Sequence, residues 1–470
     1  MGCLRCALIR PFQILRRDFL FKSTTLRQHC CAVSLSQLLD SSALFTTITF
    51  ASIEIFGGCQ THSLRVSQLP YTLDIEIHDE MAPVNERHFS YDSVSLLNAS
   101  THIRLLELCP VPAKNDELYC KLYTAPITNL PRYSAVSYAW GDNAQTHTIR
   151  IVDSDQAQTL TEEGLGYNPE SFSVLPITSS LNTCLRQFRT YKELRLTPLW
   201  IDQICINQDD NVEKSCQIQL MGQIYSSARQ VYAWLGLDAD GSDEVIQAFC
   251  QVAEHMWDSG LFGNDHRTTN WFPAPRAIFF NHIHKPEVQD LLWKVIPILE
   301  PLLREKKILA WYKRTWFSRV WTIQEFCLNP YTFFVCGDRA VLDEVVLLVW
   351  EIFHILLAFK NGGRFRDAFK TSHPEILSLM DSLSANLIPP PMQHLFETKV
   401  SWKRGKRTSM RDLLEVVSTR LDLGENRLDI LSTKYRDRVY GLLGLAYLGV
   451  RRLGIVPTPS HKRGGKIFLG

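Results

Sequence analysis

Residues 199–236 constrain the fold more than any other stretch, because they contain a complete strand–loop–helix–strand pattern. Leu199–Ile201 is a short apolar run that ends at Asp202, as a buried strand ends at the polar edge of a sheet. Apolar residues at helical spacing follow, and Val231–Leu235 then forms a second apolar run. Strands that are joined through a helix are expected to be parallel, so the stretch predicts a βαβ unit. Ligands of such sheets bind beyond the carboxyl ends of the strands, where Asp202 is expected.

The helix of this unit has a clear start. Asp210 and Glu213 have the spacing of a capping box, with Asp in place of the usual Ser or Thr. The apolar positions of the helix are Leu220, Met221, Ile224, Tyr225 and Ala228. The loop Asn207–Asn211 is therefore expected at the same edge of the sheet as Asp202.

Two further apolar runs extend the predicted sheet. Ala135–Trp140 predicts the first central strand, and Thr332–Gly337 predicts the last one. Helical patterns lie between the runs, at Ser179–Phe188 and through Trp316–Cys327. The sequence therefore predicts an α/β fold with a parallel sheet within residues 133–337. The residues expected on its buried central strands are Val136, Ile201, Val231–Trp234 and Phe333–Val335.

The flanking segments carry other patterns. Two alternating runs between residues 102 and 122 predict a hairpin that precedes the sheet. On the other side, residues 341–360 predict a strongly apolar helix and Met410–Arg420 a short amphipathic one. The basic, proline-containing segment 361–408 between them is interpreted as a linker or surface excursion.

Three blocks of the sequence closely resemble the fungal heterokaryon-incompatibility (HET) domain. The first is Tyr133–Gly141 (YSAVSYAWG), the second is residues 199–236, and the third is Trp316–Glu325 (WFSRVWTIQE). The second block includes a Trp-Ile-Asp strand end and a Cys-Ile-Asn-Gln loop. The resemblance covers roughly residues 85–340 and returns more weakly near 433–446.

The resemblance implies a fold and a domain organisation. The HET domain is similar to the Toll/interleukin-receptor (TIR) fold, so a TIR- or flavodoxin-like parallel sheet flanked by helices is expected, with a mainly helical C-terminal region. The expected parts are a leader (1–84) that is disordered or an extension of the gene prediction, an N-terminal hairpin extension (85–130), the HET domain (131–340) and a helical, apparently truncated C-terminal region (341–470).

The resemblance also implies a candidate active site. Trp321–Glu325 is similar to the TIR Trp-Cys-x-x-Glu segment, whose Glu is catalytic in NAD-cleaving members, although Thr322 stands in place of the Cys. Glu325 is thus the candidate catalytic residue. The candidate substrate-binding residues are Tyr138, Trp140, Gly141, Asp142, Asp202 and Trp321.

One carboxylate suits cleavage of the nicotinamide–ribose bond of NAD. The leaving group is already cationic, so a carboxylate near the oxocarbenium-like transition state suffices without a general acid. Structural roles compete with this interpretation: the two tryptophans as core anchors, Asp202 as a helix cap or partner of Arg319, and Glu325 in an ion pair. Two functions are therefore expected as alternatives. The first is an effector of fungal non-self recognition and cell death, with or without cleavage of NAD as its substrate and with no cofactor. The second is a non-catalytic module that self-associates or binds other incompatibility proteins.

Composition narrows the classes of partner. Lys+Arg number 50 and Asp+Glu 49, a formal charge of +1, so no global field attracts nucleic acid or an anionic membrane. The thirteen cysteines are scattered, which suits reduced thiols in the cytoplasm. No P-loop, HExxH, GxSxG or paired CxxC motif is present, and no metal site is expected.

The N-terminal segment allows a second location. Residues 1–80 contain many serines and threonines, and their arginines face only Asp18 among acids before Asp40, as in a mitochondrial transit peptide. A mitochondrial location, with residues 1–35 as the transit peptide, is therefore the alternative to a cytoplasmic one. No apolar run is long enough to span a bilayer.

Overall fold

The chain folds as two units, Met1–Asn85 and Glu86–Gly470. The computed structural model describes residues 53–58, 61–66 and 74–77 of the first unit; in the second it describes 87–109, 117–142, 144–152, 172–259, 285–361, 390–418 and 437–446, apart from short gaps and with a few isolated positions between them. The first unit contains an antiparallel sheet of β1 (Ile53–Gly58), β2 (Thr61–Val66) and β3 (Asp74–Ile77). The rest of the predicted leader lies outside the described residues.

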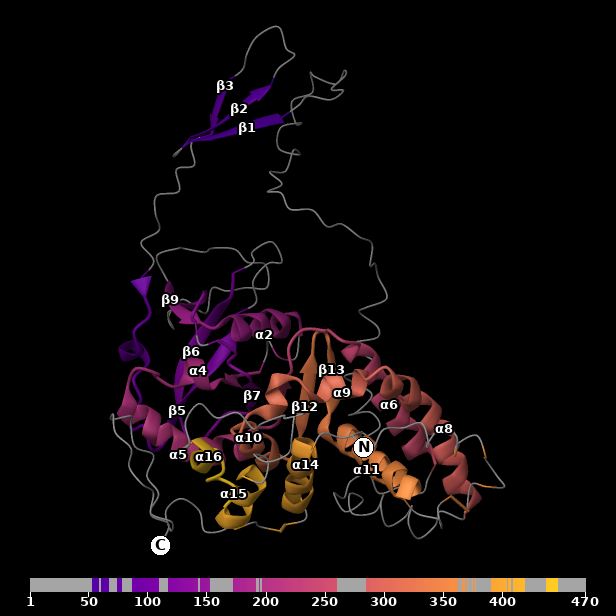
Figure 1. Ribbon diagram of the computed structural model, residues 1–470. Coiled ribbons are helices and arrows are strands. Elements are labelled where there is room, and N and C mark those ends of the chain that lie inside the picture. The colour runs from indigo at the N-terminus through magenta and orange to yellow at the C-terminus, as the bar shows by residue number, and fades with distance from the viewer. Residues whose placement is uncertain are drawn as a thin grey trace. The chain divides into compact units, whose positions relative to one another are not determined.

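The second unit is built on one mixed sheet of ten strands in the order β13-β12-β11-β7-β10-β5-β6-β8-β9-β4 (Figure 1). The strands in chain order are β4 (Arg87–His88), β5 (His102–Leu108), β6 (Tyr119–Pro126), β7 (Ser134–Tyr138), β8 (His147–Val152), β9 (Phe172–Ile177), β10 (Leu199–Trp200), β11 (Val231–Trp234), β12 (Thr332–Cys336) and β13 (Arg339–Leu342).

The four central strands confirm the predicted parallel α/β core. β7 pairs in parallel with both β10 and β11, and β11 pairs in parallel with β12. Numbered by sequence, their spatial order is 2-1-3-4, which is the order of a flavodoxin-like sheet. The apolar runs formed these strands because both faces of the sheet are covered.

The predicted N-terminal hairpin is present, but it continues the sheet. β5 and β6 pair in antiparallel fashion along their length, and Leu106 of β5 pairs with Leu199 of β10. β6 then pairs with β8, and β8 with β9, so a second group of strands extends the central sheet.

Helices cover both faces of the central strands. Tyr232 of β11 and Phe333 of β12 are register partners, and Tyr232 contacts Phe188 of α2 (Ser179–Thr190). The next pair, Ala233 and Phe334, points to the opposite face because side chains alternate along a strand. Phe334 contacts an aromatic cluster from the segment 307–328, formed by Trp311, Trp316, Phe317 and Phe326. The sheet is therefore enclosed, with α2 on one face and this segment on the other.

The other helices are distributed along the chain as follows: η2 (Tyr91–Val94), α4 (Asp202–Cys205), α5 (Asn211–Ser227), α6 (Ser242–Asp258), α8 (Pro286–Arg304), α9 (Lys307–Tyr312), η6 (Thr315–Ser318), α10 (Thr322–Leu328), α11 (Asp343–Asn361), α14 (Pro390–Lys403), α15 (Met410–Ser418) and α16 (Asp437–Tyr440). α6 packs beside α8, and α10 packs against α5 and α14 (Figure 1). No helix in the part of the chain that the structure describes has the length and apolar character needed to span a membrane.

The spacing of the block 316–327 predicts one continuous helix, but the structure does not form it. The block divides into η6 and α10, with Arg319 in extended conformation between them. The Thr322 hydroxyl donates hydrogen bonds to the carbonyl oxygens of Trp316 (3.1 Å) and Arg319 (2.7 Å), so it satisfies backbone groups that a continuous helix would have paired. The break turns Trp316 and Trp321 toward different partners.

The segment 361–408 is not only a linker, because it contains α14. Pro390 begins this helix, where a missing N–H costs nothing. Leu395, Phe396 and Val400 are buried, and so is Lys399 between them. A lysine on the apolar face, together with three consecutive prolines, conceals the helical pattern in the sequence.

Candidate functional site

Asp202 lies at the carboxyl end of β10, as the sequence predicts, and begins the short helix α4. The indole N–H of Trp140, which follows β7, donates a hydrogen bond of 2.9 Å to Asp202 Oδ2. Asp202 Oδ1 accepts from the backbone N–H of Gln203 at 2.8 Å. The two candidate residues therefore join the ends of the neighbouring strands β7 and β10.

A second polar group lies beside this pair. Gln203 Oε1 faces the hydroxyl of Tyr138 at 3.3 Å, and the Thr178 hydroxyl donates to the same oxygen at 3.2 Å. Thr178 is also the N-cap of α2, with its side chain accepting from Leu181 N. The start of α2 is thus tied to the ends of β7 and β10.

Glu325 extends from α10 to β7 and is only 4% exposed. The hydroxyl of Ser137 donates a hydrogen bond to its carboxylate, and the indole N–H of Trp316 donates to the Ser137 oxygen at 2.7 Å. These contacts place the Glu325 carboxyl inside the layer between the helices and the sheet.

Arg319 acts electrostatically on both carboxyl groups and was not among the predicted site residues. Its guanidinium donates to the carbonyl oxygen of Tyr138, and its charge favours the ionised forms of both Asp202 and Glu325. The extended conformation at Arg319 places it there, and the sequence predicts a helix at that position. The only signal in the sequence was its possible pairing with Asp202.

Burial controls the protonation of both carboxyl groups. Removal from water raises the pKa of Glu325 from its ordinary value of 4.5 to about 7, against the lowering effects of Arg319 and of the Ser137 hydrogen bond. Burial also raises the pKa of Asp202, while Arg319 and the Trp140 hydrogen bond oppose the change. Near neutral pH the Glu325 carboxyl therefore exists in both forms.

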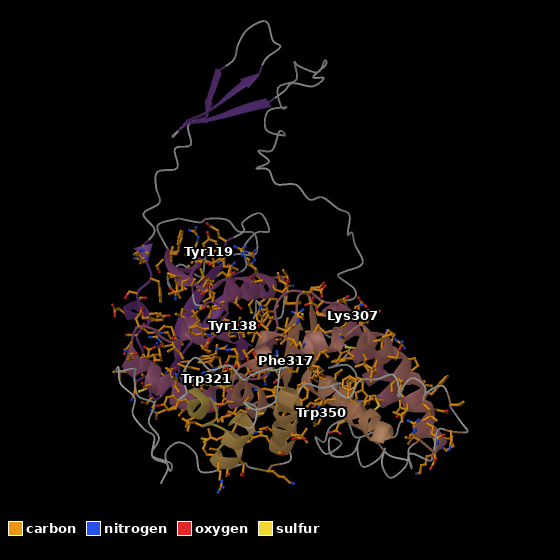
Figure 2. The ribbon with its side chains drawn as sticks, viewed as in Figure 1. Tyr119, Tyr138, Lys307, Phe317, Trp321 and Trp350 are labelled. Atoms are coloured by element: carbon orange, nitrogen blue, oxygen red, sulfur yellow. The ribbon has the colours of Figure 1, made fainter. Side chains whose placement is uncertain are left out.

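The other candidate residues lie apart from this group. Trp321 packs with Val439, Tyr440 and Leu443 of the C-terminal segment, beside α16 (Figure 2). Gly141 is exposed with a positive φ of 70°, and the exposed Asp142 accepts from Ala144 N at 3.3 Å. The structure brings together Tyr138, Trp140 and Asp202 through hydrogen bonds to one another or to Gln203, and Glu325 is coupled to Asp202 and Arg319 by charge alone.

Glu213 takes a role that its capping-box spacing does not indicate. Asp210 caps α5 by accepting from Val212 N and Glu213 N, but Glu213 does not reach back to it. Its carboxylate instead forms a two-bond pair with Arg104 of β5, at 2.6 and 3.0 Å, and accepts from Asn207 N at 2.7 Å. Arg104 of the hairpin strand β5 therefore holds the loop 207–211 in place through Glu213.

Substitution of Glu325 by glutamine should remove a specific pH dependence of stability. Because the folded pKa exceeds the ordinary value, the folded protein binds this proton more tightly than the unfolded chain does, and stability falls as the pH rises from about 4.5 to about 7. The loss is on the order of a few kcal/mol and is complete above that range. We expect Glu325→Gln to flatten urea-unfolding free energies measured from pH 5 to 8, and the exposed-carboxylate control Glu244→Gln to keep the wild-type slope. Parallel curves for wild type and Glu325→Gln would contradict this assignment.

Comparison with known proteins finds a family match that spans the three sequence blocks from which the site residues come. Residues 133–325 match the family model described as Heterokaryon incompatibility protein (HET), so the match begins at Tyr133 and ends at Glu325. The chain is 38% identical over 370 residues to a curated protein of Neurospora crassa, "Heterokaryon incompatibility protein 6, OR allele". That alignment covers 77% of this chain and 50% of the relative, so the chain spans about half the length of the curated relative that it matches. No solved structure matches the chain significantly.

Proposed function

The chain belongs to the heterokaryon-incompatibility (HET) family, and we propose that it acts in heterokaryon incompatibility, as a cytoplasmic effector of fungal non-self recognition and cell death. The observation that carries this proposal is the match over 133–325, whose three blocks meet around β7. Ser137 from the first block, Asp202 from the second and Arg319 and Glu325 from the third are linked by direct contacts or by charge.

The geometry favours a function through protein interaction. A carboxylate that stabilises an oxocarbenium ion has to approach the ribose ring closely. Glu325 is instead covered, and Ser137 and Trp316 form a hydrogen-bonded chain with it. In this arrangement Glu325 fixes α10 to the sheet. We therefore propose that the domain signals by self-association or by binding other incompatibility proteins.

Cleavage of NAD is the second candidate, and one observation favours it. Glu325, Arg319 and Asp202 form an electrostatically coupled group near the carboxyl ends of β7 and β10, where ligands of such sheets bind. Trp140, bonded to Asp202, offers an aromatic surface there. For catalysis at Glu325, η6 and α10 would have to move away from β7.

Measurements of NAD loss with the purified full chain, and of cell death in a fungal host, distinguish the two proposed functions. We expect no loss of NAD in the presence of the purified chain, and we expect wild type and Glu325→Gln to cause equal cell death when expressed at equal levels in a fungal host. Glu244→Gln serves as the matched carboxylate-to-amide control, because Glu244 is exposed and lies outside this group. If NAD disappears with wild type and turnover falls by a factor of some hundreds in a folded Glu325→Gln, catalysis replaces interaction as the function.

A further inference from the structure

The C-terminal segment 437–446, which begins with α16, packs on α5 and α10 (Figure 1). The backbone N–H of Gly444 donates a hydrogen bond of 2.6 Å to Gln324 Oε1 on α10, 120 positions away in the sequence. Trp321 lies three residues before Gln324, so the two share a face of the helix, and Trp321 packs with apolar side chains of the segment. The segment therefore contacts α10 at two points on one face.

Two glycines let the backbones of α5 and the segment approach closely. A Cβ atom at Gly444 would lie 3.0 Å from the Cα atom of Gly222 on α5 and 2.7 Å from Gln324 Oε1. A Cβ atom at Gly222 would in turn lie 3.1 Å from the Cα atom of Gly444. Gly444 does not have a positive φ, so its conformation does not require glycine. Lack of space for a side chain therefore explains the glycine at this position.

Two neighbouring residues connect the opposite contacts of α10. Gln324 accepts from the segment, whereas Glu325 reaches β7, where the Ser137 hydroxyl donates to its carboxylate. Gln324 and Glu325 are both buried, with exposed fractions of 1% and 4%. A helix as short as the seven residues of α10 is not stable by itself, so its position depends on the elements that pack against it.

The segment 437–446 has the features of a unit that opens locally. The backbone N–H groups of residues 442, 443 and 445 donate to carbonyl oxygens within the segment, so its release leaves these hydrogen bonds and the ten-stranded sheet intact. The side chains around Trp321 form a small hydrophobic cluster of their own. Its members are Val439, Tyr440 and Leu443, with Ile218, Trp321, Met410 and Leu414 partly buried against them.

We infer that residues 437–446 act as a latch, which docks through the Gly222–Gly444 contact and keeps α10 and the Glu325 carboxyl against β7. When the latch opens, α10 loses the contacts of Trp321 and Gln324, and Glu325 becomes accessible to water. The latch concerns the conformation of α10, so it is independent of whether the domain binds a partner or cleaves NAD.

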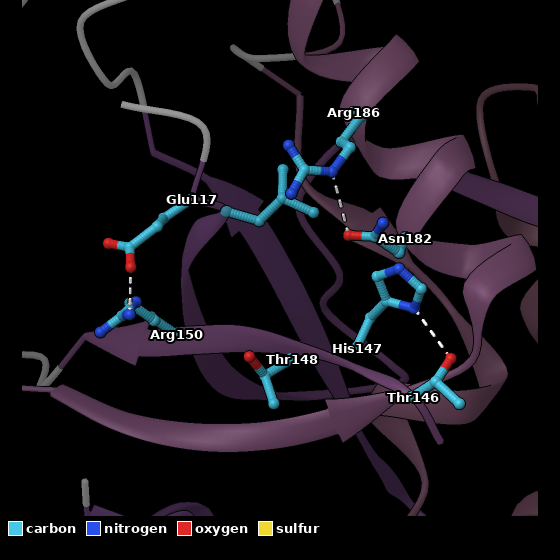
Figure 3. Close-up of a pocket in the computed structure, with 8 residues that line it drawn as sticks. Glu117, Thr146, His147, Thr148, Arg150, Asn182 and Arg186 are labelled. Carbon is cyan, nitrogen blue, oxygen red and sulfur yellow. Dashed lines mark hydrogen bonds and ion pairs between the residues drawn. The ribbon is translucent and has the colours of Figure 1, made fainter. Parts of the chain in front are cut away.

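The cavity of about 270 Å³ beside β8 and α2 lies outside this arrangement (Figure 3). None of the residues that line it comes from α5, α10 or the latch. Its side chains bond with one another, as Arg150 does with Glu117 and Arg186 with Asn182. The cavity therefore takes no part in holding α10.

Two valine substitutions in the full chain test the latch. Gly444→Val and Gly222→Val each place a side chain in the backbone contact, and valine is no less favourable than glycine inside a helix such as α5. Gln223→Val is the matched control, because it adds the same side chain to α5 at an exposed position. Amide hydrogen exchange measures the opening of the latch and of α10. Labelling of carboxyl groups with a water-soluble carbodiimide and an amine measures the accessibility of Glu325.

We expect the amides of residues 442–445 and 323–328 to exchange at least about tenfold faster in both glycine variants, while those of β11 stay within about twofold of the wild type. Labelling of Glu325 relative to the exposed Glu244 should also rise at least about tenfold. Gln223→Val should match the wild type in both measurements.

The latch would be refuted by unchanged exchange at residues 442–445 in both glycine variants, because the glycine contact would then not hold the segment. Faster exchange there without more labelling of Glu325 would refute it too, because α10 would keep its place without the segment. Equal acceleration in β11, or loss of the cooperative thermal transition in both variants, would show that the segment is part of the main core and not a latch.

Discussion

Replacement of Lys399 by methionine should lower the free energy of unfolding by about 3 kcal/mol, because it removes one of the two ammonium groups beside the buried Asp343 carboxylate and leaves only that of Lys403, at 3.4 Å. The side chains of Lys399 and Asp343 are both 0% exposed, and the ammonium lies 3.1 Å from Asp343 Oδ2. Lys399 also donates to the carbonyl oxygens of Phe326 and Asn329, just beyond the candidate site on α10. Chemical denaturation of wild type and variant measures the loss.

The double variant Lys399→Met/Asp343→Asn is the control for this interpretation. Asparagine keeps an acceptor for Thr332 N, which Asp343 Oδ1 faces at 3.3 Å, but removes the charge. Lys403 would lose its ion pair with Asp343, which is 3.4 Å long in the wild type, and keep its contact with Glu344 at 3.2 Å. We expect the double variant to be more stable than the sum of the two single losses predicts, by at least about 1 kcal/mol. Additive losses would show that the two side chains are not energetically coupled.

The buried ion pair of Lys399 and Asp343 also shows a contact that the sequence does not predict. The parallel strands were predictable because each apolar run is long enough to be buried on both faces and a helical pattern separates it from the next. The burial of Lys399 was not predictable, because a lysine among apolar residues usually indicates an exposed position. Its partner Asp343 lies 56 positions earlier in the sequence, and no local pattern records a contact over that distance.

The candidate site shows the same limit. The strand-end residues Trp140 and Asp202 were placed correctly, since parallel strands bring their carboxyl ends to one edge. The two tryptophans of the third block could not be distinguished, because the break between η6 and α10 decides that Trp316 faces Ser137 while Trp321 faces the C-terminal segment. That break depends on the contacts of Arg319 and Thr322 with groups already positioned by the fold.

Substitution of Arg104 should also lower the free energy of unfolding strongly, because this residue connects the N-terminal hairpin to the loop beside the candidate site. It is 1% exposed and forms two hydrogen bonds to Glu213 and one each to the carbonyl oxygens of Val94 (2.8 Å) and Cys205 (3.1 Å). We expect Arg104→Met to cost about 3–5 kcal/mol, because it leaves the Glu213 carboxylate buried and unpaired. Arg104→Lys should recover only part of this loss, since an ammonium group cannot form the paired bonds.

The Arg104 variants also show whether Arg104 stabilises the loop at Asn207 in particular or the whole unit. Glu213 accepts from Asn207 N as well as from Arg104, so a carboxylate that loses its partner should move toward water and release that amide. Hydrogen exchange at Asn207 should therefore accelerate in Arg104→Met, and by more than the exchange of the central strand β11. The exposed Arg132→Met serves as control and should stay within about 0.5 kcal/mol of wild type. Equal acceleration at Asn207 and throughout β11 would mean that Arg104 stabilises the unit as a whole and has no particular part in holding the loop at the end of β10.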